Sequence, residues 1–147
     1  RLKTLADALA VTSRVKFWGE YPDEDLPRRM ADADFLVLPS VTTEEMFGMV
    51  LLEAMAASRP VITTAVPSGV REVNQAGTTG LEVPIRDVKA LADAMRTLAI
   101  NPALREQYGT AGKARVRSRF TVDAMAEAHL ELYQRVRGPK EGRRRRG

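Results

Sequence analysis

The chain has 147 residues, about one domain's worth, and its 44% hydrophobic and 29% charged residues are typical of a globular protein. It has no cysteine and one histidine, which excludes a disulfide framework, a thiol nucleophile and a multi-histidine metal site. No apolar run is long enough to span a membrane. The chain begins at Arg1 without an initiator methionine or a signal-peptide pattern, so we expect a piece of a longer protein.

The net charge of +4 comes from one end of the chain. Six basic residues and one acid lie in residues 137–147, so this segment carries +5 and the other 136 residues carry −1. Its glycines and proline predict a disordered basic tail over residues 138–147. Two interpretations stay open, a solvated end without a role and a weak contact with an anionic membrane surface, and we do not expect nucleic acid as a partner.

Apolar spacing predicts helices and strands that alternate along the chain. Helices are expected over residues 2–9, 23–32 and 47–57, with a short one after 67–69, and strands over 14–18, 35–38, 60–63 and 81–83. Three further helices follow, with expected caps at Asp87, Asn101 and Thr121. Continuous apolar runs such as residues 35–38 are typical of strands buried on both faces.

This alternation predicts an α/β fold with a Rossmann-like parallel sheet that is covered by helices on both faces. In such sheets, ligands bind beyond the carboxyl ends of the strands. Three loops follow predicted strands there, over residues 18–20, 39–47 and 64–69. We therefore expect these loops to lie together along one edge of the sheet.

The loop and helix over residues 40–53 carry the most chemistry. The first backbone donors of the predicted helix are the amides of Phe47, Gly48, Met49 and Val50. With the helix dipole, these amides form a site suited to a phosphate or diphosphate, and Gly48 lets an anion approach the backbone. Ser40 either donates its hydroxyl to such a phosphate or caps the loop.

Two glutamates flank this expected anion site. Glu45 precedes the helix and Glu53 lies within it, about 9 Å of helix beyond Phe47. An ionised carboxylate suits a pair of adjacent hydroxyls, so Glu45 and Glu53 would hold sugars on either side of a diphosphate, which is the layout of a nucleotide sugar. In the alternative interpretation, Glu45 only favours the helix dipole and Glu53 is a structural carboxylate at the helix edge.

These residues resemble the signature of the retaining, nucleotide-sugar-dependent glycosyltransferases of family four, the glycosyl-transferases-group-one type. The signature has two glutamates separated by seven residues, with Phe-Gly after the first and Glu-Ala-Met at the second. Here it reads Glu45-Met46-Phe47-Gly48, then Met49 to Leu52, then Glu53-Ala54-Met55. Flanking segments extend the resemblance over about residues 2–136, including 14–19, 33–40 and 60–63.

The resemblance implies that residues 1–137 are part of the C-terminal, donor-binding half of a two-domain GT-B glycosyltransferase. The parent enzyme would transfer a sugar from a nucleoside diphosphate with retention of configuration and without a metal or other cofactor. Glu45 would contact the transferred sugar, the amides from Phe47 to Val50 would hold the diphosphate, and Glu53 would hold the ribose. Trp18 and Gly19 correspond to the base pocket. The acceptor, a sugar, lipid or polysaccharide, would be bound by an N-terminal domain, in a cytoplasmic protein peripheral to the inner face of the membrane.

The chain also departs from the family pattern. Glycine is usual at the positions of Met46, Ser58 and Ser68. The first two strands of the domain, with the Arg and Lys that neutralise the diphosphate, have no counterpart. None of the basic residues Arg28, Arg29, Arg59 and Arg71 takes their place in the pattern. We therefore expect the isolated chain to have an open sheet edge, marginal stability and no transferase activity; the alternative is a non-catalytic nucleotide-sugar binding or regulatory module.

Overall fold

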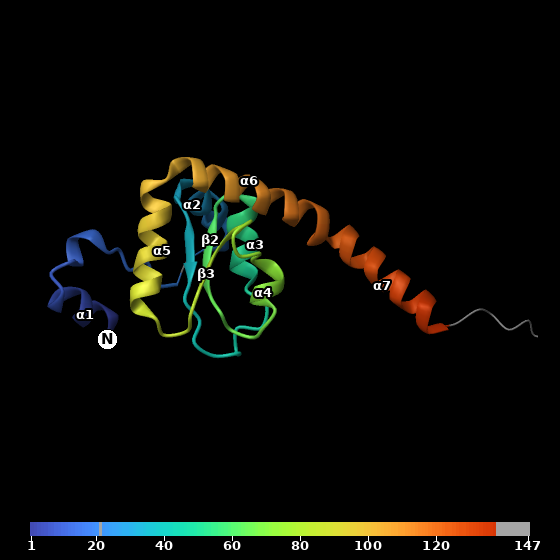
Figure 1. Cartoon of the computed structure of the whole chain (residues 1–147), viewed down its shortest axis with the longest axis horizontal. Helices are drawn as coiled ribbons and strands as arrows, with labels where there is room; N and C mark the ends of the chain where they lie inside the picture. The colour runs from blue at the N-terminus through green and yellow to red at the C-terminus, as the bar shows by residue number, and fades with distance from the viewer. Residues whose placement is uncertain (21, 138–147) are drawn as a thin grey trace, which may run out of the picture.

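A computed structural model shows how the elements are arranged, and it describes residues 1–20 and 22–137 (Figure 1). The predicted basic tail, residues 138–147, lies outside the described residues. The helices are α1 (Leu2–Ala8), α2 (Leu26–Asp32), α3 (Met49–Ala56), α4 (Val70–Val73), α5 (Val88–Ile100), α6 (Pro102–Arg119) and α7 (Val122–Arg137), and the strands are β1 (Leu36–Leu38), β2 (Val61–Thr64) and β3 (Gly80–Val83). Single 3₁₀ turns cover Thr12–Arg14 and Asp23–Asp25.

The three strands form a parallel sheet in the order β1-β2-β3. β2 lies in the centre and all four of its residues are buried, whereas the residues of β1 are half-buried. Among the described residues, β1 pairs with β2 alone, so its other edge has no strand neighbour. The predicted α/β class and parallel sheet are confirmed, and the predicted open edge lies at β1.

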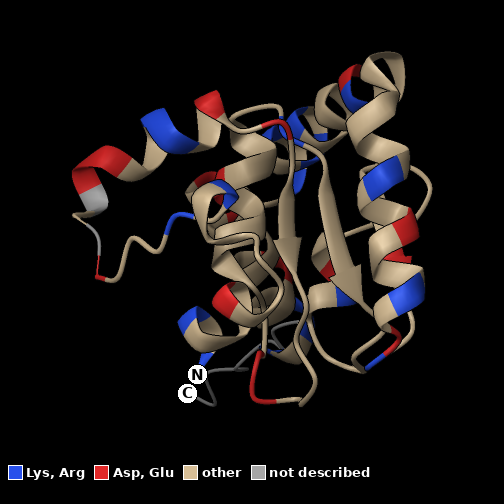
Figure 2. Ribbon diagram, turned by 90° about the vertical axis from the view of Figure 1, so that its left-hand side faces the viewer, with Lys and Arg blue, Asp and Glu red and all other residues tan. Residues whose placement is uncertain are grey.

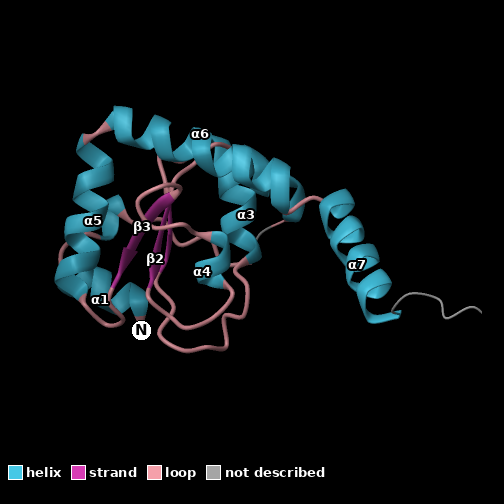
Figure 3. Cartoon of the chain, turned by 45° about the vertical axis from the view of Figure 1, so that its right-hand side comes forward, coloured by secondary structure: helices cyan, strands magenta, loops and turns pink. Residues whose placement is uncertain are grey.

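Helices cover both faces of the sheet, as predicted (Figures 1 and 3). Successive residues of a strand point to opposite faces, and β2 shows this directly. Val61 packs in one core with Leu51 of α3, and Ile62 packs in the other with Leu98 of α5 and Tyr108 of α6. The charged residues lie mainly on the helices and loops that surround the strands (Figure 2). Two apolar layers therefore fix the orientation of β2 and of the loop that follows it.

The three predicted helix caps are confirmed by hydrogen bonds. The Asp87 carboxylate accepts from the Ala90 amide at 2.8 Å, and the Asn101 side chain accepts from the Leu104 amide at 3.0 Å. The Thr121 hydroxyl accepts from an amide in the first turn of α7 at 3.1 Å. Each cap satisfies one of the donors that lack a partner within the helix.

The predicted strand over residues 14–18 is wrong. Arg14 ends a 3₁₀ turn, and residues 15–19 are irregular chain without strand pairing. Val15, Phe17 and Trp18 are all exposed. A strand is stabilised by hydrogen bonds to a neighbour, and no described strand lies beside this segment, so its apolar pattern alone does not produce a strand.

Helix α7 extends away from the rest of the fold (Figures 1 and 3). None of its residues is buried, and it contacts the body near its first turn. Within the described part of the chain, no helix is long and apolar enough to cross a membrane.

Candidate functional site

Helix α3 starts two residues later than predicted, because Gly48 interrupts the helical conformation. Gly48 is the N-cap, with φ of +74° and ψ of +58°, a left-handed conformation that favours glycine. A Cβ at this position would also lie 2.9 Å from Cδ1 of Leu51. Phe47 is therefore outside the helix, and the amides of Met49 and Val50 are at its first two positions.

Glu45 lies directly at this helix start. Its Oε1 accepts a hydrogen bond from the Gly48 amide at 3.0 Å, and the residue is half-buried. One of the four amides predicted to bind a diphosphate is thus occupied by a carboxylate of the same loop. An anion is bound at the predicted place, but that anion is the Glu45 side chain.

Two of the three predicted loops are brought together at the carboxyl edge of the sheet. The Thr64 hydroxyl, at the end of β2, donates to the Ser40 carbonyl after β1. Gly69, in the next loop, lies against Met46 and Phe47 so closely that a Cβ there would be 2.4 Å from the Met46 carbonyl oxygen. The loop before α3 therefore rests on the loop before α4, and Ser40 is held through its carbonyl.

The third loop, with the predicted base-pocket residues Trp18 and Gly19, lies against α2. The guanidinium carbon of Arg29 is 3.4 Å from the centroid of the Trp18 ring, and the Lys16 ammonium is 3.7 Å from it. The expectation that this loop follows a strand fails with the strand over residues 14–18. Trp18 is instead held by cation–π contacts with Arg29 of α2 and with Lys16 of its own segment. Gly19 next to it has a left-handed φ of +67°.

Glu53 projects from α3 beside a hollow of about 660 Å³ between α2 and α3. The other lining residues are apolar: Leu26, Pro27, Ala31, Ala56 and Ala57. Among the described residues, Glu53 forms no side-chain hydrogen bond and no ion pair, and it is exposed. It is therefore the single charged group of an apolar hollow that borders the helix carrying the anion-binding amides.

The three departures from the family pattern have different structural settings. Met46 is 77% exposed at the tip of the loop, and its carbonyl, not its side chain, contacts Gly69. Ser58 has φ of +60° just after α3, so it adopts the left-handed conformation for which glycine is preferred. The Ser68 hydroxyl accepts from the Val70 amide at 3.4 Å at the start of α4.

Other residues support the site, and the sequence patterns did not predict their roles. The Phe47 ring meets Phe120, at the junction of α6 and α7, edge to face at 5.9 Å. Below the Gly69 loop, the buried Asn74 amide donates to the Thr63 hydroxyl at 2.8 Å and accepts from Thr79 at 3.0 Å. The contact between Phe47 and Phe120 joins residues far apart in the chain, and the Asn74 contacts depend on how β2 lies beside the turn before β3, so helix and strand periodicity carry no signal for them.

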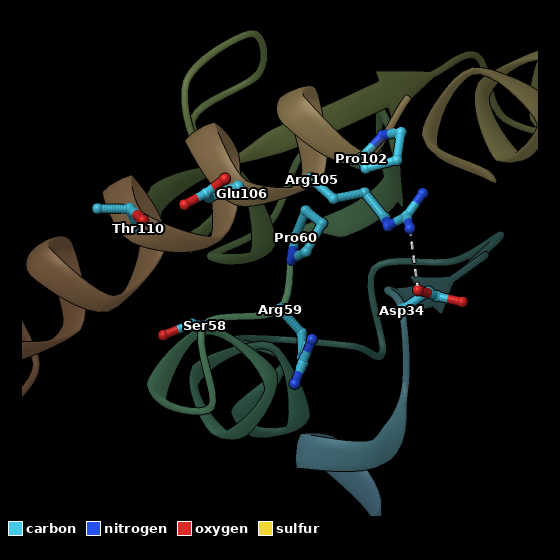
Figure 4. Close-up of a pocket in the computed structure, with 8 residues that line it drawn as sticks. All are labelled: Asp34, Ser58, Arg59, Pro60, Pro102, Arg105, Glu106 and Thr110. Atoms are coloured by element: carbon cyan, nitrogen blue, oxygen red, sulfur yellow. Dashed lines mark ion pairs between the residues drawn. The ribbon is translucent and has the colours of Figure 1, made fainter. Parts of the chain in front are cut away.

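A second hollow, of about 330 Å³, lies at the opposite, amino edge of the sheet (Figure 4). Its arginines have structural partners. Arg105 pairs with Asp34 at 3.2 Å and donates to two carbonyls at the end of α5, and Arg59 donates to the Ala31 carbonyl at the end of α2. Arg71, near the Gly69 loop, pairs with Glu82 at 3.0 Å. These cations cap helices or neutralise acids, so they do not replace the cationic pair of the family pattern.

The described residues include no group of three or more His, Cys, Asp or Glu that could hold a metal ion. Of the sequence-predicted residues, Glu45, Gly48 and Met49 meet at the start of α3. Glu53 lies one turn further along this helix, whereas Trp18 is held against α2.

Comparisons with known proteins agree with this fold. The profile of the family described as "Glycosyl transferases group 1" matches residues 1–115. The chain is 35% identical over 131 residues to a phosphatidyl-myo-inositol mannosyltransferase of Mycobacterium leprae, covering 89% of this chain and 34% of that protein. Sucrose-phosphate synthase of Thermosynechococcus elongatus superposes with a TM-score of 0.82 at 34% identity, over 92% of this chain and 33% of that one. Anabaena HepE, solved in complex with UDP, superposes with a TM-score of 0.81 at 26% identity, over 90% and 35%.

The fold is that of the C-terminal domain of GT-B glycosyltransferases, and the chain belongs to the family of group 1 glycosyl transferases. It spans about a third of the length of the curated relatives it matches.

Proposed function

We propose that the chain is the donor-binding portion of a retaining glycosyltransferase, which moves a sugar from a nucleoside diphosphate to an acceptor sugar, lipid or polysaccharide. In this proposal the diphosphate lies at the start of α3, Glu45 contacts the transferred sugar and Glu53 binds the ribose. Ser40 borders the phosphates, and Trp18 and Gly19 border the base. The transfer in this proposal requires the donor and the acceptor and no metal or other cofactor.

The observation that carries the proposal is the setting of Glu53. Glu53 is exposed and has no hydrogen-bond or ion-pair partner among the described residues, so its carboxylate oxygens are available to accept hydrogen bonds from a ligand. It borders an otherwise apolar hollow that is large enough for part of a nucleotide. A pair of ribose hydroxyls in this hollow would donate to the carboxylate.

Glu45 supports the same arrangement in a different way. Its carboxylate now accepts from the Gly48 amide at 3.0 Å. A diphosphate and a carboxylate cannot share this amide, because like charges at contact distance repel strongly. Donor binding would therefore displace Glu45 from the amide, and the released carboxylate would be close to the sugar that follows the diphosphate. Anabaena HepE, which has the same fold, was solved with UDP, and this supports a nucleoside diphosphate as the ligand class.

The assignment of Glu53 is tested by titrating the chain with UDP-, GDP- and ADP-sugars and with the 2′,3′-dideoxy form of the donor that binds. We expect the ribose form to bind at least about tenfold more tightly, because hydrogen bonds to a charged group contribute about 1.5–3 kcal/mol. Glu53→Gln should remove most of this preference. Glu44→Gln is the matched control, because Glu44 is exposed on the loop before α3 and, among the described residues, accepts a hydrogen bond from Thr42 alone. Equal loss of preference in both variants, or an unchanged preference in Glu53→Gln, contradicts the assignment.

A non-catalytic nucleotide-sugar binding or regulatory module is the second candidate. It is favoured by the lack of positive charge beside α3. No Lys or Arg lines the hollow beside Glu53, and none lines the apolar hollow that Phe47, Met49 and Phe120 form on the other side of this helix start. Without a cation, the free energy of diphosphate binding is less favourable. The negative charge that develops on the diphosphate as it leaves the sugar is also not stabilised. We expect the 147-residue chain to transfer no sugar alone, and transfer to any acceptor, measured with and without a metal chelator, would contradict this expectation. A cytoplasmic location, peripheral to the membrane, stays a prediction.

A further inference from the structure

Arg115 of α6 is anchored on the end of α4. Its Nε donates to the Val73 carbonyl at 3.1 Å and its Nη2 donates to the Glu72 carbonyl, and these are the last two residues of α4. Nη2 also lies 3.5 Å from Oε1 of Glu72, and the Arg115 side chain is 9% exposed. The last carbonyls of a helix lack partners within it, and a buried cation needs acceptors. The two requirements are met together, so the guanidinium is held in one place.

The same guanidinium lies over an aromatic ring that contacts the loop before α3. Its central carbon is 5.3 Å from the centroid of the Phe120 ring, within the range of cation–π attraction. The Phe120 ring in turn meets Phe47 edge to face, with an interplanar angle of 72°. Phe47 directly precedes Gly48, whose amide donates to Glu45. A chain of contacts therefore leads from the end of α4 to the start of α3.

Phe47 also contacts the other end of α4. Gly69, the N-cap of α4, is so close that a Cβ there would lie 3.1 Å from Cδ2 of Phe47. Phe47 itself is 36% exposed, so its position depends on these two neighbours more than on burial in a core. Arg115 joins both of them, because it binds the end of α4 and lies over the Phe120 ring.

We propose that Arg115 is a positioning residue for donor binding. It holds the Phe120 ring against Phe47, and this contact fixes the backbone that presents the Gly48 and Met49 amides to the diphosphate. The inference rests on the proposed function, in which the donor lies at the start of α3. Arg115 acts through Phe120 and not by contact with the donor, because its Nε and Nη2 donate to α4. Groups that bind a ligand need such supporting contacts to stay within about 0.5 Å of their productive positions.

An arginine with a purely structural role predicts a different result. Such a residue would only join α6 to α4, so its replacement would lower the free energy of unfolding. The amides at the start of α3 and the nucleotide affinity of the folded chain would then stay as they are. The two roles are therefore separated by measurements on the folded state.

The experiment compares Arg115→Lys with Arg119→Lys. Lysine keeps the charge but lacks the planar fork that donates to two carbonyls while it lies over a ring. Arg119 is the matched control, because it lies 3.5 Å from the same Glu72 Oε1, is 58% exposed and makes no ring contact within the described part of the chain. In NMR spectra without nucleotide, we expect the Gly48 amide to shift in Arg115→Lys and to keep its position in Arg119→Lys.

The second measurement is the affinity for whichever of UDP, GDP and ADP binds best, at a temperature at which urea unfolding shows that each variant is folded. We expect Arg115→Lys to raise the Kd at least about threefold and Arg119→Lys to raise it less than about twofold. Phe120→Leu is a second variant of the same path, which keeps the bonds of Arg115 to α4. It should also raise the Kd at least about threefold, and adding Arg115→Lys to it should raise the Kd less than about twofold further.

Three results would each overturn the proposal: an unchanged Gly48 amide in Arg115→Lys, equal effects of Arg115→Lys and Arg119→Lys on the Kd, or additive effects of Arg115→Lys and Phe120→Leu. Failure of the proposed function gives a different result, in which the parent chain binds none of the three nucleotides. The Gly48 amide then still decides whether Arg115 fixes this loop.

Discussion

Gly69 supports the loop that carries the proposed donor site, and the substitution Gly69→Ala tests that support. Gly69 has an ordinary helical φ of −59°, so the constraint is space and not backbone conformation. A Cβ there would lie 2.4 Å from the Met46 carbonyl oxygen and 3.1 Å from Cδ2 of Phe47. Ordinary contact begins near 3.4 Å, so the Met46 carbonyl must retreat by about 1 Å. The Gly48 amide, two residues further on, must move with it.

Two consequences of this shift can be measured. Overpacking of this kind costs about 1–3 kcal/mol of folding free energy. A hydrogen bond to a charged group contributes about 1.5–3 kcal/mol, so losing the bond from the displaced Gly48 amide should weaken nucleotide binding at least about tenfold. The measurements are urea unfolding for the free energy of unfolding and titration calorimetry with the donor for the affinity.

Gly109→Ala is the control for lost stability. A Cβ at Gly109 of α6 would lie 2.1 Å from the Ser58 carbonyl oxygen, a similar clash just after the end of α3 that is remote from its start. Both variants should be less stable, and only Gly69→Ala should bind the donor less tightly at a temperature where both are folded. The reasoning is refuted if Gly69→Ala binds like the parent chain or if Gly109→Ala weakens binding equally.

Three further tests probe the contacts around this site and after α3 by urea unfolding. The edge-to-face contact at 5.9 Å predicts that a double-mutant cycle of Phe47→Leu and Phe120→Leu gives a coupling of about 0.5–1.5 kcal/mol, and additive effects would contradict it. Asn74→Ala should cost about 1–3 kcal/mol, because it leaves buried hydrogen-bonding groups without partners, and a cost below about 0.5 kcal/mol would count against this network. Ser58→Gly should raise the free energy of unfolding by up to about 1 kcal/mol, because glycine adopts the left-handed conformation at this position without strain. Ser68→Gly is the control and should give no such gain, so equal effects of the two substitutions would contradict the strain argument.

The helix caps and buried strands could be predicted from the sequence, because their causes are local. Asp87 accepts a hydrogen bond from an amide three residues ahead, and the apolar run at residues 60–63 corresponds to the fully buried strand β2. The similar run at residues 35–38 also forms a strand, but β1 is only half-buried. The segment over residues 14–18 has a similar apolar pattern, but it lacks a neighbouring strand. A strand depends on its partner, so the pattern alone was insufficient there.

The sequence predicted which elements carry the candidate site residues, but it did not predict their geometry. The spacing of Glu45 and Glu53 placed both residues at α3. Gly48, however, adopts a left-handed conformation, so the helix starts later than predicted, and the Glu45 carboxylate accepts a hydrogen bond from the Gly48 amide. The contact between Phe47 and Phe120 depends on where α6 ends after crossing the fold. Such contacts follow from the packing of distant elements and not from local spacing.

The central claim, that a nucleoside diphosphate binds at the start of α3, is tested most directly by following backbone amides in NMR spectra during titration with UDP, GDP and ADP. We predict that the amides of Gly48, Met49 and Val50 shift most, and that the Gly48 amide shifts as Glu45 is displaced from it. The same titration in Glu53→Gln should require more ligand to reach the same shifts. Shifts centred on Arg59 and Arg105 at the amino edge, or no shift at the start of α3 with any of the three nucleotides, would contradict the account.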